Sequence, residues 1–355
     1  MRIAFLLLLS SALGACSTGM RPAPSPQPAL EMQSPVHVAN ASARGLDDLI
    51  VDEVDDQIKD ESLDQVKDES LDQVRDKLRR DAAAVAQVTA LCAEIGRKLS
   101  SVSMADCQRH NLQHAAVSVL NRPLAYKDFA PSESGAQQGR VLLIGGIHGD
   151  EFSSVSVVFK WMDLLDQQSA WPVLLRVVPL ANPDGLLRVK SQRQNEKGVD
   201  LNRNFPTLDW ERNARDYWVK TTAKNIRRYP GEASASEPET RWLVEQIRDF
   251  APDVIIALHA PHHLVDYDGP PSAPQQVGNL DLRQLGVYPG SLGNYAGHDL
   301  KLPVVTLELQ SAGTMPAASE IEGMLVDLRQ WLQVQLGQQA ISSDPPSVPG
   351  NATSR

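Results

Sequence analysis

The chain has 355 residues and a formal net charge of −10 at pH 7, with an ordinary share of apolar residues. This length is sufficient for one large domain with extensions. The low basic content gives no electrostatic footprint of a nucleic-acid-binding protein. After the N-terminal residues, no apolar run approaches the roughly 20 residues that a membrane-spanning helix needs.

Residues 1–15 have the pattern of a secretory signal peptide, because Arg2 precedes an apolar run over residues 3–9 and small residues follow. The small residues lead to Cys16, and the segment resembles a bacterial lipoprotein signal, in which this cysteine becomes the lipidated first residue. Ser17 comes next, and by the same resemblance it favours the outer membrane. We therefore expect a lipid-anchored protein on the periplasmic side. A chance cysteine beside an ordinary cleavage site is the alternative.

Two segments without apolar periodicity follow the signal. Residues 16–46 are rich in Pro, Ala and Ser, which predicts a flexible tether. Residues 47–81 hold 14 acidic and 6 basic residues, and the octapeptide Lys-Asp-Glu-Ser-Leu-Asp-Gln-Val occurs identically at 59–66 and 67–74. An eight-residue period drifts from two helical turns, so this segment predicts a solvated acidic spacer. A specific acidic interaction arm is the alternative.

Residues 82–111 are predicted to form a small helical appendage held by a disulfide. Apolar residues recur at spacings of three and four from Val85 to Leu99, which is typical of a helix. If Cys16 carries lipid, Cys92 and Cys107 are left, and an exported compartment permits them to pair. Two buried free thiols are the alternative.

Residues 112–336 alternate strand-like and helix-like segments. Strands are predicted at 117–120, 124–126, 141–144, 173–180, 254–258 and 304–309. Helices are predicted from after His148 through 161–165, over 237–250 and over 317–336. This alternation predicts an α/β fold with a mostly parallel mixed sheet and helices on both faces. We expect a turn at 182–185 and a disordered polar tail over 337–355.

Polar residues stand where three of these strands end. His148 and Glu151 follow one apolar run, His259 closes another, and Glu308 lies near the end of a third. In open α/β sheets, ligands bind at the carboxyl ends of the strands. Two histidines and a glutamate match catalytic zinc sites, which use three protein ligands and keep one position for water. We therefore predict one zinc site built from His148, Glu151 and His259.

Nearby residues leave alternatives open. His262 and His263 are rival ligands, although a loop rim is the simpler interpretation. Glu308 lies in an otherwise apolar strand, and a buried carboxylate is costly unless it is paired or near a metal. If that strand is central, Glu308 is predicted to be a general base. If it is an edge strand, Glu308 faces solvent.

The segment 193–206 supplies complementary charge through Arg193, Asn202 and Arg203. A guanidinium can stabilise an oxyanion, or bind a carboxylate bidentately with help from an amide. The spacing Arg193-Gln-Asn-Glu-Lys-Gly-Val-Asp-Leu-Asn202-Arg203-Asn-Phe-Pro resembles the signature of zinc carboxypeptidases. The resemblance covers residues 112–336 and includes the three predicted ligands and Glu308 in family order.

The resemblance implies a role for each matched residue. The three predicted ligands would hold one zinc ion per chain. Glu308 would act as a base and then as an acid, and Arg193 would polarise the scissile carbonyl. Asn202 and Arg203 would bind the free carboxylate beside the cleaved bond.

A tyrosine on a mobile loop is also implied by the family. Tyr288 precedes Gly290 and Ser291 as the pattern requires, but at a short spacing. Tyr295 is the other candidate. Neither choice follows from the residue chemistry alone.

Within this family, the segments 198–206 and 236–240 are most similar to the bacterial murein peptide amidases. That similarity implies a zinc-dependent enzyme that acts on a cell-wall (murein) peptide, between γ-D-glutamate and meso-diaminopimelate. Acyl-amino-acid deacylases of the succinylglutamate desuccinylase type, which share the zinc ligands and an Asn-Arg pair, are the alternative. A non-catalytic wall-binding lipoprotein is the alternative from another class of protein.

Overall fold

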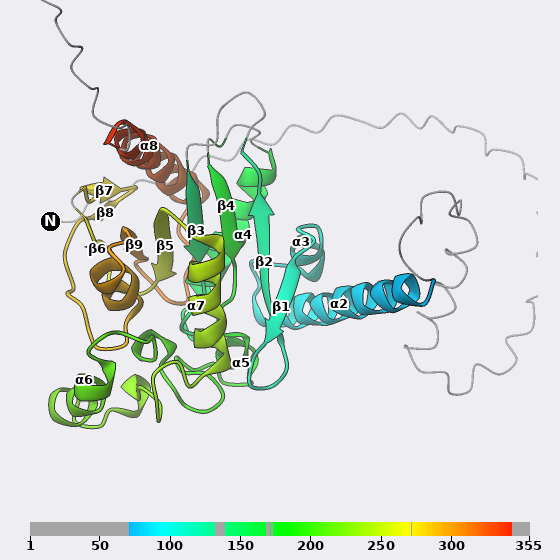
Figure 1. Ribbon diagram of the computed structural model, residues 1–355. Helices are drawn as coiled ribbons and strands as arrows, with labels where there is room; N and C mark the ends of the chain where they lie inside the picture. The colour runs from blue at the N-terminus through cyan, green and yellow to red at the C-terminus, as the bar shows by residue number, and fades with distance from the viewer. Residues whose placement is uncertain (1–70, 132–138, 168–170, 172, 271, 343–355) are drawn as a thin grey trace, which may run out of the picture. The chain divides into compact units, whose positions relative to one another are not determined.

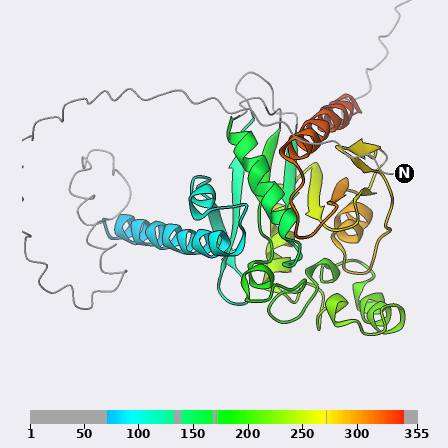
Figure 2. The same ribbon diagram turned by 180° about the vertical axis from the view of Figure 1, so that it is seen from behind.

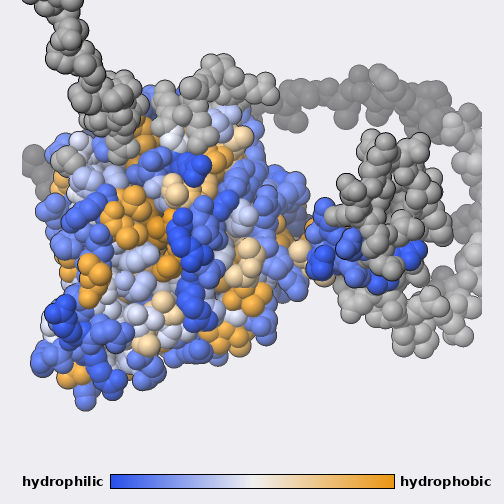
Figure 3. Space-filling view, in the orientation of Figure 1, coloured by the Kyte–Doolittle hydropathy of each residue, from blue (hydrophilic) through white to orange (hydrophobic). Residues whose placement is uncertain are grey.

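The computed structural model describes residues 71–131, 139–167, 171, 173–270 and 272–342 (Figure 1). The predicted signal peptide with Cys16, the tether 16–46 and most of the acidic spacer lie outside the described residues. Residues 343–355 of the predicted tail also lie outside them. None of the helices in the described ranges is long and apolar enough to cross a membrane. The face seen in Figure 3 is mostly hydrophilic and carries small hydrophobic patches.

A seven-stranded sheet forms the centre of the domain, in the order β1-β2-β4-β3-β5-β9-β6. Its strands are β1 (Gln113–Val117), β2 (Pro123–Phe129), β3 (Arg140–Ile144), β4 (Leu174–Val178), β5 (Val254–His259), β6 (Leu264–Asp268) and β9 (Val304–Glu308). The neighbours β4, β3, β5 and β9 are parallel, whereas β2 and β6 run antiparallel to the strands beside them. The predicted mostly parallel mixed sheet is therefore confirmed.

Helices cover both faces of the sheet, as predicted. In Figure 1, α7 (Pro238–Phe250) crosses the near face, and Figure 2 shows α4 (Phe152–Gln167) and α8 (Ala318–Ser342) over the other. The two faces bury separate hydrophobic clusters, because successive strand residues point to opposite sides. β5 is buried along its whole length, which explains its unbroken apolar sequence.

Shorter elements connect these layers. They are α3 (Met104–Gln108), α5 (Pro183–Leu187), η2 (Leu201–Arg203), α6 (Trp210–Asp216), η3 (Tyr217–Thr221), η4 (Ile226–Arg228), β7 (Gln276–Val277), β8 (Leu280–Asp281) and η5 (Gly293–Asp299). The predicted turn at 182–185 proved to be the start of α5, where Asn182 caps the helix by accepting a hydrogen bond from the Gly185 amide.

The segment predicted as a helical appendage is present as α2 (Leu71–Lys98) and α3. α2 begins inside the second octapeptide, earlier than the predicted start at residue 82. Cys92 and Cys107 are fully buried and joined in a disulfide. Apolar residues of both helices belong to the same hydrophobic cluster as α4, so the segment packs against the sheet domain.

Two further predicted boundaries were wrong. The first strand is Gln113–Val117 and not 117–120, because Asn121 adopts a φ of 59° just before Pro123 and turns the chain into β2. α8 continues to Ser342, so the segment 337–342 is helical and not part of a disordered tail. The strand β6 and the helices α6, η3 and η5 were not predicted.

Candidate metal centre

The carboxyl ends of three neighbouring parallel strands bring the predicted residues together. His259 ends β5 and Glu308 ends β9, and the two are direct cross-strand partners. Their side chains lie on the same face of the sheet as α7. β9 lies between β5 and β6, so Glu308 is on an interior strand and the edge-strand alternative is excluded.

A tight connection between β3 and α4 brings His148 and Glu151 to the same place. Gly146 adopts a φ of 64°, a conformation that glycine reaches without strain. A Cβ atom on Gly149 would lie 2.2 Å from the carbonyl carbon of Gly185, so only glycine fits there. α4 begins at Phe152, directly after Glu151. The backbone therefore fixes the side chains of His148 and Glu151 at the carboxyl ends of the parallel strands.

The three predicted ligands converge as a buried cluster, each at most 5 % exposed. Their ligand atoms all lie within 4.8 Å of one another. His148 Nδ1 is 2.8 Å from Glu151 Oε1 and 3.0 Å from His259 Nδ1, and His259 Nδ1 is 3.1 Å from Glu151 Oε2. In the described part of the chain, this is the one group of histidine, cysteine and acidic residues with metal-site geometry.

Asp200 contacts the predicted ligand His148 on the ring nitrogen that faces away from the other two ligands. The sequence did not predict this role. The Asp200 carboxylate lies 3.2 Å from His148 Nε2 and accepts a hydrogen bond of 2.9 Å from Arg193. A proton on Nε2 leaves the Nδ1 lone pair free for a metal, which is the usual function of such a partner. The only signal for this role was the position of Asp200 two residues before Asn202.

The charges of this cluster stabilise one another. Burial and the Arg193 guanidinium would lower the pKa of His148, but the carboxylates of Glu151 and Asp200 outweigh both and raise that pKa. Burial would raise the pKa of Glu151, but the two histidines hold it well below its usual range. Arg193 and His148 likewise hold the pKa of Asp200 below its usual range against the effect of burial. Both carboxylates are therefore ionised at neutral pH, as metal ligation and its support require.

The donor set fits zinc. Two imidazole nitrogens and one carboxylate are the ligands of a common class of catalytic zinc site. Glu308 stands beside them as the cross-strand partner of His259. It is 8 % exposed, its Oε2 is buried with no hydrogen-bond partner, and it forms no ion pair with a described residue. Such an atom is costly unless a metal or a reacting group faces it. His262 and His263 are not members of the ligand group.

The cluster opens into a cavity of about 250 Å³. Its lining includes the three ligands, Glu308, Arg193, Asn202, Arg203 and Tyr288. The Arg203 guanidinium lies 4.5 Å from the centre of the Tyr288 ring, so this tyrosine is part of the site. Tyr295 stacks on Phe205 within a hydrophobic cluster and does not line the cavity.

Arg203 has the properties of a site for an anion. Its Nε is buried without a hydrogen-bond partner. Burial lowers the pKa of Arg203, and the nearby guanidiniums of Arg193 and Arg228 lower it further, although the Asp200 carboxylate opposes the shift. A carboxylate in the cavity would offset that repulsion.

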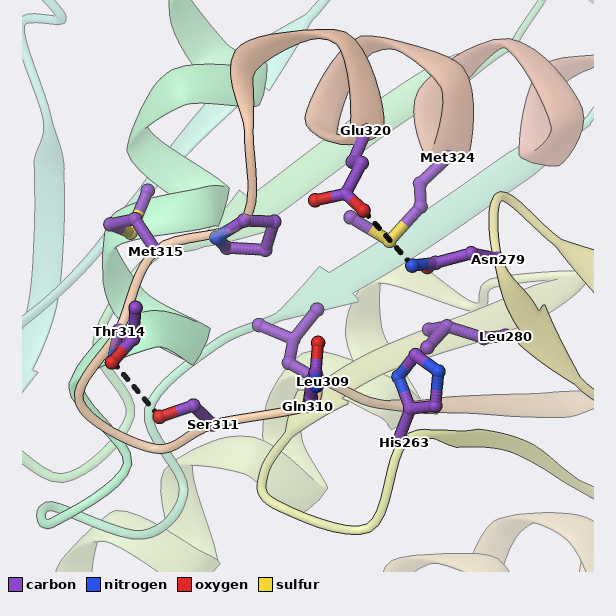
Figure 4. A pocket seen from close by; sticks show the side chains of 11 residues that line it. His263, Asn279, Leu280, Leu309, Gln310, Ser311, Thr314, Met315, Glu320 and Met324 are labelled. Atoms are coloured by element: carbon purple, nitrogen blue, oxygen red, sulfur yellow. Dashed lines mark hydrogen bonds between the residues drawn. The ribbon is translucent and has the colours of Figure 1, made fainter. Parts of the chain in front are cut away.

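A larger cavity of about 350 Å³ lies beyond the end of β9 (Figure 4). Its walls include His263, Gln310, Ser311 and Glu320, and the Glu320 carboxylate already accepts a hydrogen bond from Asn279. None of the metal-centre residues lines it. Its size therefore does not make it the site of the chemistry.

Sequence reasoning also missed three charged residues of the cavity wall. Asp266 and Asp268 of β6 lie directly opposite Thr306 and Val304 of β9 and line the cavity. Arg228 lines it from η4. None of the three carries a recognisable motif.

Comparisons with known proteins agree with this geometry. Residues 97–276 match the zinc carboxypeptidase family. The chain is 29 % identical to murein peptide amidase A of Escherichia coli K12 over 228 residues, which cover 62 % of this chain and 89 % of that protein. It is 31 % identical to murein peptide amidase A of Vibrio campbellii over 200 residues, 54 % of this chain and 76 % of that one.

A crystal structure of murein-tripeptide amidase from E. coli O157 covers 62 % of this chain and 91 % of its own, with 28 % identity and a TM-score of 0.45. The family match includes the three predicted ligands, Arg193, Asn202 and Arg203, and it ends before Glu308. The chain is a metallopeptidase that belongs to the zinc carboxypeptidase family.

Proposed function

We propose that this enzyme hydrolyses murein peptides at the amide bond between γ-D-glutamate and meso-diaminopimelate. The observation that carries the proposal is the cavity that joins a buried His₂Glu set, the Glu308 carboxylate, whose Oε2 has no hydrogen-bond partner, and the Arg203 guanidinium, whose buried Nε has none either. The relatives named murein peptide amidase A support the substrate class.

Different side chains of the site would bind the metal, transfer the proton and stabilise the developing negative charge. His148, Glu151 and His259 would hold zinc, which when bound supplies Lewis-acid activation of water and of the substrate carbonyl. Glu308 would take a proton from the attacking water and return it to the leaving amine, so the proton balance closes. Arg193 would stabilise the negative charge that develops on the carbonyl oxygen.

Asn202 and Arg203 would hold the carboxylate of the leaving residue. Asn202 Oδ1 accepts a hydrogen bond of 2.7 Å from the Leu292 amide, and among the described residues its side-chain nitrogen has no partner. That nitrogen and the Arg203 guanidinium can both donate to one carboxylate. Diaminopimelate offers this carboxylate next to the scissile nitrogen.

The far end of diaminopimelate carries an ammonium group beside a second carboxylate, and the cavity holds two aspartates that can face the ammonium group. Asp266 is 6 % exposed, and neither it nor Asp268 forms an ion pair with a described residue. Burial and the neighbouring Asp266 raise the pKa of Asp268 to about 6, although His298 opposes the shift. An ammonium group beside the two carboxylates would favour the ionised form of Asp268, and so would offset both the effect of burial and the repulsion from Asp266.

We expect Asp268→Asn to weaken binding of the murein tripeptide. The change removes the charge but keeps the size, so KM should rise about tenfold to a hundredfold, the value of a charged hydrogen bond. The wild-type KM should fall as the pH rises through about 6, because Asp268 then loses its proton, and the variant should lack this step. Steady-state assays across pH measure both effects.

Two controls make that test specific. Asp281→Asn removes an exposed carboxylate from β8 that does not line the cavity, so its KM should stay at the wild-type value. A tripeptide with 2-aminopimelate in place of diaminopimelate lacks the distal ammonium group but keeps the distal carboxylate, and Asp268→Asn should not change its KM. An equal effect of Asp268→Asn on both substrates would contradict the assignment.

The assay that tests the proposal compares murein tripeptide with N-succinylglutamate. Release of diaminopimelate from the tripeptide is expected. N-succinylglutamate has no ammonium group to face Asp266 and Asp268, so a deacylase of the succinylglutamate type fits the cavity less well. Turnover of N-succinylglutamate alone would overturn the proposal, and absence of any turnover by zinc-loaded protein would favour a wall-binding role.

We also propose that lipid on Cys16 anchors the enzyme at the outer membrane, on its periplasmic side. Cell fractionation should find the wild-type protein with the outer membrane, and Cys16→Ser should release it into the soluble fraction, because one or more acyl chains supply the membrane affinity. Equal membrane association of the two proteins, without incorporation of labelled fatty acid, would refute the anchor.

A further inference from the structure

A second cavity of about 310 Å³ adjoins the metal centre. Glu151, Arg193 and Arg228 line both cavities. The residues that line only the second cavity are Asp150, Asn225, Arg227, Pro261 and Ala312, and this cavity does not include Asn202, Arg203 or Tyr288. If the leaving residue occupies the cavity with Arg203, the second cavity receives the acyl side of the scissile bond.

Arg228 is the unpaired cation at the junction of the two cavities. It ends η4 and is half-buried. Its neighbour Arg227 forms an ion pair of 2.7 Å with Asp150. The Arg228 guanidinium has no ion-pair or hydrogen-bond partner among the described residues. A guanidinium in this position is therefore available to a ligand.

The other guanidiniums of the site are already committed. Arg193 donates to Asp200, and Arg203 faces the cavity of the leaving residue. Arg228 lies close enough to Arg203 to lower its pKa. The two guanidiniums therefore contribute a positive field near the place where the cavities meet, which the Glu151 carboxylate lining both cavities partly offsets. This field favours a second anion on the substrate, in addition to the carboxylate at Arg203.

The chemistry of a γ-glutamyl bond supplies such an anion. A glutamate linked through its side-chain carboxyl keeps its α-carboxylate free, and this group lies on the acyl side of the scissile amide. A glutamate linked through its α-carboxyl has a peptide carbonyl in that place. A cation in the acyl-side cavity can therefore distinguish the two linkages.

We propose that Arg228 binds the free α-carboxylate of the γ-linked glutamate and so selects γ-glutamyl substrates. This inference rests on the proposed function, because it assumes that the substrate is a γ-glutamyl peptide. Arg228 is then a specificity residue that touches substrate, and Arg227 is kept in place by Asp150. The two arginines of η4 thus have different roles.

The test pairs two enzymes with two substrates. The substrates are L-Ala-γ-D-Glu-diaminopimelate and its analogue in which the glutamate α-carboxylate is an α-carboxamide. For the wild-type enzyme we expect kcat/KM to be about tenfold to a hundredfold lower on the carboxamide, as for the loss of a charged hydrogen bond. Arg228→Gln should lower kcat/KM on the tripeptide by a similar factor and leave the carboxamide almost unaffected.

Two further variants separate charge from structure. Arg228→Lys should recover part of the discrimination, because it restores the charge without the bidentate geometry. Arg212→Gln removes an exposed arginine from α6 that lines neither cavity, and it should behave as wild type on both substrates. Zinc content measured for every variant checks that the metal centre remains assembled.

The outcomes distinguish the inference from the function on which it rests. A wild-type enzyme that cleaves both substrates equally well would overturn the role of Arg228 and leave the proposed function in place. Arg228→Gln with an equal loss on both substrates would also overturn it. A zinc-loaded wild-type enzyme that cleaves neither substrate would overturn both.

Discussion

Glu308→Gln should lower kcat on the murein tripeptide by about 10²–10⁴-fold, the usual contribution of a general acid–base group. The substitution keeps the size of the side chain and removes its ability to accept and return a proton. Glu308 is not one of the three ligands, so the variant should bind zinc with the wild-type stoichiometry. Turnover and metal content are measured on the same preparation.

A matched variant controls for a general loss of charge. Glu322→Gln removes an exposed carboxylate from α8 and should leave kcat unchanged. If Glu308→Gln hydrolyses the tripeptide as fast as wild type, another group moves the proton and the assignment fails. If it loses zinc as well as activity, Glu308 is a ligand and not a base.

His259→Ala should have the other large effect, because it removes one of the three ligands. Zinc affinity should fall by more than the roughly 10–100-fold typical for loss of an outer-shell partner. Activity should fall in proportion to the bound metal. Metal analysis after dialysis against a weak chelator, together with turnover, measures both.

His262→Ala provides the matched histidine variant. His262 is exposed at the cavity rim and does not belong to the ligand group, so zinc content should remain unchanged. If His262→Ala lost zinc and His259→Ala kept it, His262 would be the zinc ligand and His259 would not. That result would support the alternative from the sequence, in which His262 or His263 binds the metal.

The strands that hold the site could be predicted because they are buried on both faces. β3, β5 and β9 appear in the sequence as short unbroken apolar runs, and the chemically active residues stand where those runs stop. Their order in the sheet is not readable from the runs themselves. The direct pairing of His259 with Glu308 depends on that order, so it became visible only in the structure.

β6 escaped prediction for a physical reason. It alternates apolar residues with Asp266 and Asp268, and acidic residues in so short a segment indicate a solvated loop rather than a strand. In the fold these carboxylates face the cavity, where a ligand can supply the missing charge. Arg228 was missed in the same way, because an arginine in a polar loop is most often a solvated residue.

The most direct test of the account is the release of diaminopimelate from the murein tripeptide by the purified enzyme, followed by mass spectrometry before chelation, after it, and after zinc is restored. We expect about one zinc per chain, with release that stops on chelation and returns with the metal. Release that continues in the metal-free protein would contradict a zinc-dependent amidase.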